Sequence, residues 1–369
     1  MRQPVLFAIF LVGAFASERA WAQGGRGCCC GRSPTFREAI RVSDGVVIAR
    51  VIKVDQDANL GSDLDVLRVL KSHPAIASRQ LVHIARELPV GDWKAPAKFI
   101  LFGSVENGKW EPWIGLSASH EAVAYLEDLL KLATVNPKES LRYFVQHLGT
   151  RNTDILTDVL QELREAPRPL LADVGKRCVP QELRKHLQSS TAFPYLHPVC
   201  GLLLGYCGAK EDLELLEAAF KKQPCEEFLT AMVHLVPKSG VSPITKAVAS
   251  AEFPTCYSGL RAIRNFYQDE PGVVSKKDLL ALMDKLLDKP DIADFVIEDL
   301  RRWKRWEFAD RVLGLAEKKT HDSRVVQRCI LRFAIQCPNQ AAARFVNDAR
   351  ARDSDLVADV EEILKLETE

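Results

Sequence analysis

The sequence predicts an α+β multidomain protein, in which a small β-barrel or sandwich precedes an α-helical repeat array. Two observations carry this prediction. Residues 45–113 contain several short segments dense in β-branched and alternating apolar side chains. From about Pro137 the hydrophobic period lengthens to that of a helix and stays so to the C-terminus. Because the helical repeat is degenerate, an irregular helical domain is the alternative.

The N-terminal part is expected to form about five strands over roughly 80 residues, which is typical of a small barrel or sandwich. Asn107-Gly108, the strongest hairpin signal in the chain, separates the last two strands. A helix over 120–132, capped by Ser119, closes this domain or bridges to the next. The expected strands span residues 45–54, 64–70, 80–85, 98–104 and 109–113.

The segment Cys200–Lys221 predicts a helix, a tight turn and a second helix. Leu202 and Tyr206 share an apolar helix face, Gly208 permits the turn, and Asp212 caps the next helix. A helical hairpin cannot bury its faces alone, so it requires similar neighbours. The expected helices of this part span residues 138–148, 152–165, 180–188, 195–206, 211–222, 225–235, 255–267, 275–288, 291–302, 305–318, 322–336, 339–350 and 354–366.

Two local signals place boundaries in the chain. Asn136-Pro137 favours a break, because proline disfavours helical geometry in the residue before it. Ser275, followed three residues later by Asp278, is the clearest helix start. We therefore expect three parts, which are a signal peptide over 1–22, a β-rich domain over 23–135 and a helical repeat domain over 136–369.

The first 22 residues have the pattern of a secretory signal peptide. Arg2 provides a positive start, an apolar run follows over Pro4–Ala16, and Ala20-Trp21-Ala22 is a small-x-small cleavage site. The apolar run is too short to span a membrane, and no later stretch is long and apolar enough. A buried N-terminal helix is the alternative. The pattern predicts an exported protein, periplasmic or extracellular, with no integral membrane segment after cleavage.

The charge balance limits the class of partner. Cleavage after Ala22 removes two arginines and one glutamate, which leaves 48 basic and 48 acidic residues. A neutral chain argues against nucleic acid or an anionic membrane as the main partner. We expect the partner to be another exported protein.

Cys28, Cys29 and Cys30 are the most unusual local feature and the candidates for a metal site or a reactive thiol. Adjacent cysteines project in different directions in an extended chain, and no cysteine or histidine follows at a short ligand spacing. Export favours structural disulfides instead, so we expect neither a metal nor another cofactor. Core thiols are expected at three positions on apolar helix faces, Cys200, Cys207 and Cys329.

No complete catalytic motif is present, and we expect no enzyme activity. The segment that begins at His120 lacks the second histidine of a zinc-protease motif. The segment that begins at Gly115 misses the nucleophile-elbow pattern at its last residue. Three scattered histidines, His186, His197 and His234, meet only if the fold brings them together.

A basic patch with interleaved tryptophans is the candidate interaction site. It comprises Arg301, Arg302, Trp303, Lys304, Arg305 and Trp306. Such a patch suits a phosphate or an acidic partner. The alternative is a helix end, where cations stabilise the C-terminus and tryptophan packs at the turn.

Nearly all of the mature chain resembles an uncharacterised family of exported proteins of planctomycete-type bacteria. The residues that carry the resemblance are a signal peptide, a short cysteine cluster, SDGVVIARVIKVDQ, LDVLRVLKS, KFILFG, CGLLLGYCGAKEDLELLE and LLALMDKLLDKPDIADFVIEDLRRWKRWEFADRVLGL. The resemblance is strongest over 275–315. It implies a HEAT-like α-solenoid behind a β domain, and it brings no known activity or site residues.

The β domain is also similar to the OB barrel of netrin modules and of tissue inhibitors of metalloproteases, in which cysteines precede the first strand. That inhibitor mechanism needs a cysteine at the mature N-terminus, whereas the preferred cleavage here leaves Gln23 first. The region also has no cysteine between Cys30 and Cys178, so the usual bridges of that family cannot form.

Three functions follow from these observations. The first is an exported non-enzymatic scaffold that presents a helical-repeat surface to another protein. The second is an inhibitor or binder of a secreted hydrolase through the β domain. The third is a thiol or metal protein that uses Cys28 to Cys30.

Overall fold

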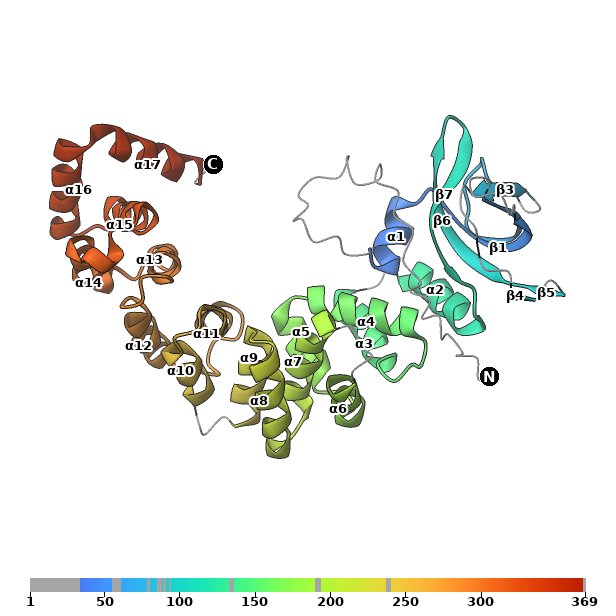
Figure 1. The fold of residues 1–369 in the computed structure, drawn as a ribbon, viewed down its shortest axis with the longest axis horizontal. Helices are drawn as coiled ribbons and strands as arrows, with labels where there is room; N and C mark the ends of the chain where they lie inside the picture. The colour runs from blue at the N-terminus through green and yellow to red at the C-terminus, as the bar shows by residue number, and fades with distance from the viewer. Residues whose placement is uncertain are drawn as a thin grey trace, which may run out of the picture. The chain divides into compact units, whose positions relative to one another are not determined.

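The computed structural model describes residues 34–54, 61–77, 80–84, 88, 91–92, 94–132, 136–189, 194–236 and 240–367. The predicted signal peptide and the Cys28–Cys30 cluster lie outside the described residues. The chain divides into two compact units, Met1–Ala166 and Pro167–Glu369. The expected boundary at 135–136 therefore falls inside the first unit. The α+β class is confirmed, because an antiparallel sheet is followed by helices (Figure 1).

The first unit holds an open five-stranded antiparallel sheet in the order β3-β2-β1-β6-β7. Its central strand β1 pairs with β2 on one side and with β6 on the other. The hairpin between β6 and β7 turns at Asn107 and Gly108, whose φ values of 51° and 78° confirm the predicted tight turn. The described strands are β1 (Gly45–Val54), β2 (Ser62–Lys71), β3 (Leu81–Ile84), β6 (Lys98–Glu106), β7 (Lys109–Ser117) and a separate ribbon of β4 (Gly91–Asp92) and β5 (Ala95–Pro96).

Alternate side chains of these strands form one buried cluster, and the residues between them in β1 and β6 are also buried, so the central strands are covered on both faces. The cluster includes Val47, Val51, Leu64, Leu101 and Trp110. Four helices complete the described part of the first unit, and the first of them was not expected from the sequence. They are α1 (Phe36–Val42), α2 (His120–Leu132), α3 (Pro137–Gln146) and α4 (Thr153–Glu165).

The second unit is helical throughout its described residues. Its α-helices are α5 (Arg168–Gly175), α6 (Pro180–Gln188), α7 (His197–Cys207), α8 (Leu213–Lys222), α9 (Glu226–Leu235), α10 (Ser242–Ala249), α11 (Phe253–Gln268), α12 (Lys276–Leu286), α13 (Ala293–Arg302), α14 (Ala309–Leu313), α15 (Arg324–Gln336), α16 (Gln340–Arg352) and α17 (Ser354–Leu366). Helices α5 and α10 were not expected. Short 3₁₀ segments divide the segment 305–318, which was expected to be one helix.

Helices of the second unit pack on close neighbours in sequence, in two alternating sets. The odd-numbered helices pack on one another at α7–α9, α9–α11, α13–α15 and α15–α17, and the even-numbered ones at α10–α12 and α14–α16. Each hairpin also packs internally, as α8 does on α9 and α10 on α11. The two helices predicted over Cys200–Lys221 are present as α7 and α8. They do not form a closely packed hairpin with each other, because α7 packs on α6 and α9 and α8 packs on α9. Asp212 does not cap α8 directly; it accepts the backbone N–H of Ala209 in a 3₁₀ turn before it.

One junction in the odd-numbered set differs from the others. The backbones of α11 and α13 approach less closely than those of α9 and α11 or of α13 and α15. Long side chains connect these two helices instead. We call this junction the α11–α13 seam.

Candidate interaction surface

Three pairs of large side chains connect α11 to α13 across the seam. The Tyr257 ring lies 5.3 Å from the ring of Phe295. Farther along both helices, Arg264 Nε donates to Asp299 Oδ2 at 2.6 Å. At the far end the rings of Tyr267 and Trp303 stack, with centroids 3.8 Å apart and planes 13° apart. Because residue numbers rise together in the three pairs, the two helices run parallel.

Two cations lie beside the Tyr267–Trp303 stack. The Lys276 ammonium is 5.1 Å from the centroid of the Tyr267 ring, and the Arg305 guanidinium is 5.7 Å from it. Both distances fall within the range in which a cation is attracted to an aromatic face. Lys276 comes from the first turn of α12, so the stack gathers residues from three separate helix ends.

The structure divides the predicted basic patch into two groups. Arg302 and Lys304 are exposed, and Trp303 and Arg305 are half-buried beside Tyr267. Trp306 instead packs edge-on against the Phe333 ring of α15, at 5.2 Å. We call the outward-facing set, Tyr267, Lys276, Arg302, Trp303, Lys304 and Arg305, the basic-aromatic cluster.

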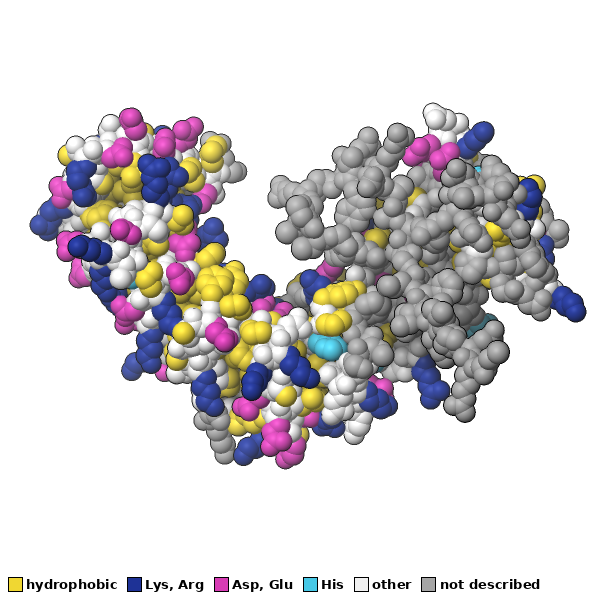
Figure 2. All heavy atoms as spheres, viewed as in Figure 1, with side chains coloured by type: hydrophobic (Ala, Val, Ile, Leu, Met, Phe, Trp, Pro, Cys, Tyr) yellow, Lys and Arg dark blue, Asp and Glu magenta, His cyan; other side chains and the backbone are white. Residues whose placement is uncertain are grey.

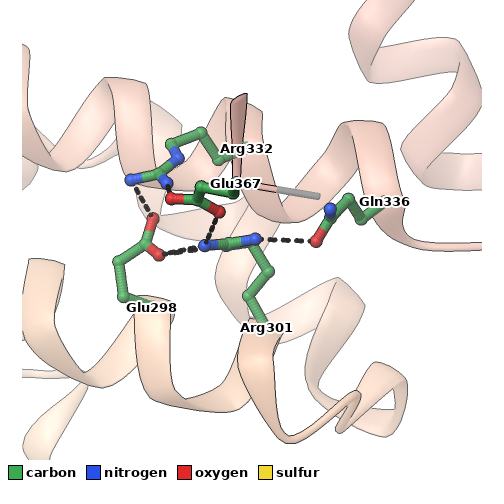
Figure 3. Close-up of polar contacts among 5 residues, drawn as sticks. All are labelled: Glu298, Arg301, Arg332, Gln336 and Glu367. Atoms are coloured by element: carbon green, nitrogen blue, oxygen red, sulfur yellow. Dashed lines mark hydrogen bonds and ion pairs between the residues drawn. The ribbon is translucent and has the colours of Figure 1, made fainter. Parts of the chain in front are cut away.

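Arg301 belongs to the interior and not to this cluster. It is only 4% exposed and donates to Glu298 at 2.7 Å, to Glu367 at 2.9 Å and to Gln336 at 2.8 Å. Arg332 pairs with both of the same carboxylates, at 3.0 Å for Glu298 (Figure 3). The guanidinium of Arg301 therefore joins α13 to α15 and to the segment just after α17.

The backbone that carries the cluster is a helix C-terminal turn. The N–H of Arg305 donates to the carbonyl of Leu300 and the N–H of Lys304 to that of Arg301, which is the Schellman pattern. Lys304 has a φ of 55°, the left-handed conformation that usually belongs to glycine. The helix-end interpretation thus explains the backbone of the patch. The Lys304 side chain at this turn is exposed.

The other end of the seam exposes aromatic rings that the sequence analysis did not identify. Phe253 and Tyr257 stack at 5.6 Å with planes 9° apart, and Phe295 follows next to Tyr257. Phe253 is 46% exposed and Phe295 is 36% exposed. Hydrophobic side chains reach the surface in this part of the second unit (Figure 2). Phe253 and Tyr257 are four residues apart, and in a helix this spacing places both side chains on one face, which is the sequence signal for this site.

The charges around the seam are unbalanced. Among the residues that the structure describes, Lys276, Arg302 and Lys304 form no ion pair with a carboxylate. Asp299 is already engaged by Arg264, and its pKa is raised because burial outweighs that pairing. Arg305 pairs with Glu307 at 3.5 Å, and the charge of Arg302 favours the ionised form of Asp299. Lys276, Arg302 and Lys304 are thus the cations of the cluster that form no ion pair within the described residues.

A second polar group lies between α7, α9 and α11. The buried Glu270 accepts the Tyr206 hydroxyl at 2.7 Å and lies 2.5 Å from His234 Nε2. Burial tends to raise the pKa of Glu270, but hydrogen bonds from His234 and Tyr206 lower it overall. Of the three scattered histidines, His234 contacts Glu270. His186 lies near enough to His197 to add to the lowering of the His197 pKa, which burial mainly causes.

Within the described residues, the remaining sequence candidates add no site. His120 begins α2, and no group of three or more metal-binding side chains occurs among the described residues. The seven cysteines that the structure describes are unbridged, which confirms free thiols at Cys200, Cys207 and Cys329, although Cys207 is only half-buried. Burial raises the pKa of Cys200 to about 12.

Within the described residues no helix combines the length and the apolar composition needed to cross a membrane. Searches of protein-family models and of curated proteins found no match to this chain.

Proposed function

We propose that the chain is an exported, non-enzymatic scaffold that binds another protein through the α11–α13 seam. The observation that carries the proposal is the seam itself, where exposed aromatic rings and unpaired cations share one junction. Aromatic residues and arginine are the residue types enriched at the energetic centres of protein interfaces.

The proposed architecture consists of an OB-like barrel and a HEAT-like α-solenoid. For the barrel, the support is that the edge strands β3 and β7 lie near each other, as closure of the sheet requires. For the solenoid, the support is the alternation of odd-numbered and even-numbered helices, each set packing on its own neighbours. Solenoids use such extended layers as binding surfaces.

Site-specific photo-crosslinking of the exported protein tests the proposed function. A photoreactive amino acid replaces Lys276 in one variant and, in a second, control variant, the exposed Lys221 of α8, a helix that packs on α9. We expect one discrete crosslinked protein from the Lys276 variant and none from the control. Identical products from both variants, or none from either, would contradict a binding surface at the seam.

A further inference from the structure

We infer that the seam binds an extended acidic segment of its partner, with an apolar or aromatic side chain at one end and carboxylates at the other. This inference rests on the proposed function and deepens it, because it states the chemistry of the occupant. Four observations support it, which are the polarity of the seam, its length, its width and the position of Lys304.

The seam is polarised along its length. Phe253, Tyr257 and Phe295 form the apolar end, and the basic-aromatic cluster around Tyr267 forms the cationic end. Exposed aromatic faces bind apolar side chains, and unpaired cations attract carboxylates. A ligand that satisfies both ends has its apolar and acidic groups separated.

The length of the seam sets that separation. From Tyr257 to Tyr267 the helix rises about 15 Å, and from Phe295 to Trp303 about 12 Å, at about 1.5 Å per residue. An extended peptide advances about 3.3 Å per residue. Four or five residues of extended chain therefore connect the two ends, whereas a helical ligand would need about eight to ten.

Side-chain contacts, and not close backbone packing, connect α11 to α13 across the width of the seam. Helices α11 and α13 do not pack backbone to backbone as their neighbours do, and Arg264 with Asp299 bridges the middle. Because Arg264 and Asp299 neutralise each other, a ligand needs no charged group at the middle of the seam. Within the basic-aromatic cluster, Lys276, Arg302 and Lys304 form no ion pair with a described carboxylate.

The position of Lys304 supports a functional use of its charge. It occupies a left-handed conformation where glycine is less strained, yet the side chain is exposed and pairs with no described carboxylate. The Schellman turn explains this backbone conformation, and it holds the Lys304 side chain at the surface. A carboxylate of the ligand would supply the missing partner.

Fluorescence anisotropy with the full mature chain tests the inference. The main probe is a fluorescein-labelled peptide that carries two phenylalanines, a linker of four glycine and serine residues and three aspartates. One matched peptide replaces the aspartates by lysines, a second replaces the phenylalanines by serines, and a third removes the linker. A single-stranded oligothymidylate of similar length tests for a nucleic-acid ligand.

We expect the main probe to bind at least about tenfold more tightly than any of the matched peptides. Its affinity should fall as salt rises, because exposed charges are screened. The double variant Lys276→Glu with Lys304→Glu should weaken binding about tenfold or more, and Phe253→Ser with Phe295→Ser about fivefold or more. Lys221→Glu, a matched charge reversal on α8, should stay within about twofold. Circular dichroism verifies that each variant remains folded.

Three results would overturn the inference. They are no binding of the main probe at millimolar concentration, equal binding by the seam variants and the wild type, and tighter binding of the oligothymidylate. If crosslinking at position 276 traps a partner while the acidic peptide does not bind, the inference fails and the proposed function stands. If crosslinking traps no partner and the acidic peptide does not bind, both the inference and the proposed function are wrong.

Discussion

The hydroxyl of Tyr125 donates a 2.7 Å hydrogen bond to Asp158, a buried carboxylate of α4. The other oxygen of Asp158 accepts the backbone N–H of Phe36, the first residue of α1, at 2.5 Å. One side chain thus joins α1, α2 and α4 of the first unit. Burial raises the pKa of Asp158 to about 7, although both donors oppose the shift.

This carboxyl group makes the stability of the first unit depend on pH. Folded Asp158 keeps its proton up to about pH 7, whereas an unfolded aspartate releases it near about pH 4. The resulting stabilisation is fully present below about pH 4 and is lost as the pH rises through about 7. We expect Asp158→Asn, which cannot titrate, to flatten the decline of the urea midpoint between pH 5 and pH 8. Asp128→Asn, at an exposed carboxylate of α2, should keep the wild-type decline; an unchanged decline in the Asp158 variant would contradict this assignment.

Two adjacent arginines should differ sharply in their contribution to stability. Arg301→Met removes one of the two cations that Glu298 and Glu367 share, since Arg332 remains, and it leaves Gln336 without its donor. Loss of these buried, charged hydrogen bonds should cost about 1–3 kcal/mol. Arg302→Met removes an exposed cation and should change the free energy of unfolding by less than about 0.5 kcal/mol. Urea unfolding of both variants measures the difference, and equal effects would mean that Arg301 is not the interior residue described.

Lys304→Gly should stabilise the chain. Glycine adopts the left-handed conformation at this helix end with less strain than lysine, a difference of about 0.5–1 kcal/mol. The same variant should also bind the acidic peptide described above less tightly, because it removes an unpaired cation. Thermal unfolding measures the change in stability, and fluorescence anisotropy on the same preparation measures the change in peptide affinity. A variant that gains stability and keeps full affinity would show that the charge of Lys304 has no part in binding.

Gly205 allows α7 to lie close against α9. A Cβ at this position would clash with the backbone and side chain of Ala231, so Gly205→Ala forces the two helices apart. Such overpacking destabilises by about 1–3 kcal/mol. Gly314→Ala is the matched control, since its added methyl group meets no atom within 4 Å. Differential scanning calorimetry should show a lower melting temperature for the first variant alone.

Truncation distinguishes the two candidate boundaries. A chain of residues 167–369 retains every helix of the second unit and should be soluble and helical by circular dichroism. A chain of residues 137–369 adds α3 and α4 without α1 and α2, which leaves Asp158 without Phe36 and Tyr125 and uncovers the buried Phe144. We expect this longer chain to aggregate. If it is the more stable of the two, the expected boundary near 135 describes folding better than the division at 166.

The sequence by itself determined the elements whose signals are local. Asn107-Gly108 specifies its hairpin because both residues accept positive φ. Ser275 begins α12 by accepting the N–H of Asp278, only three residues away. The short helices α5 and α10 were missed, because eight residues carry too little periodicity to be distinguished from a loop.

Tertiary packing decided the candidate surface. The six residues from Arg301 to Trp306 form one basic run in the sequence, yet Arg301 lies buried against Glu298 and Lys304 is exposed. Tyr267 meets Trp303 only because α12 brings two parallel helices side by side. Contacts between residues so far apart in the chain depend on how helix faces pack, and no short stretch of sequence records that arrangement.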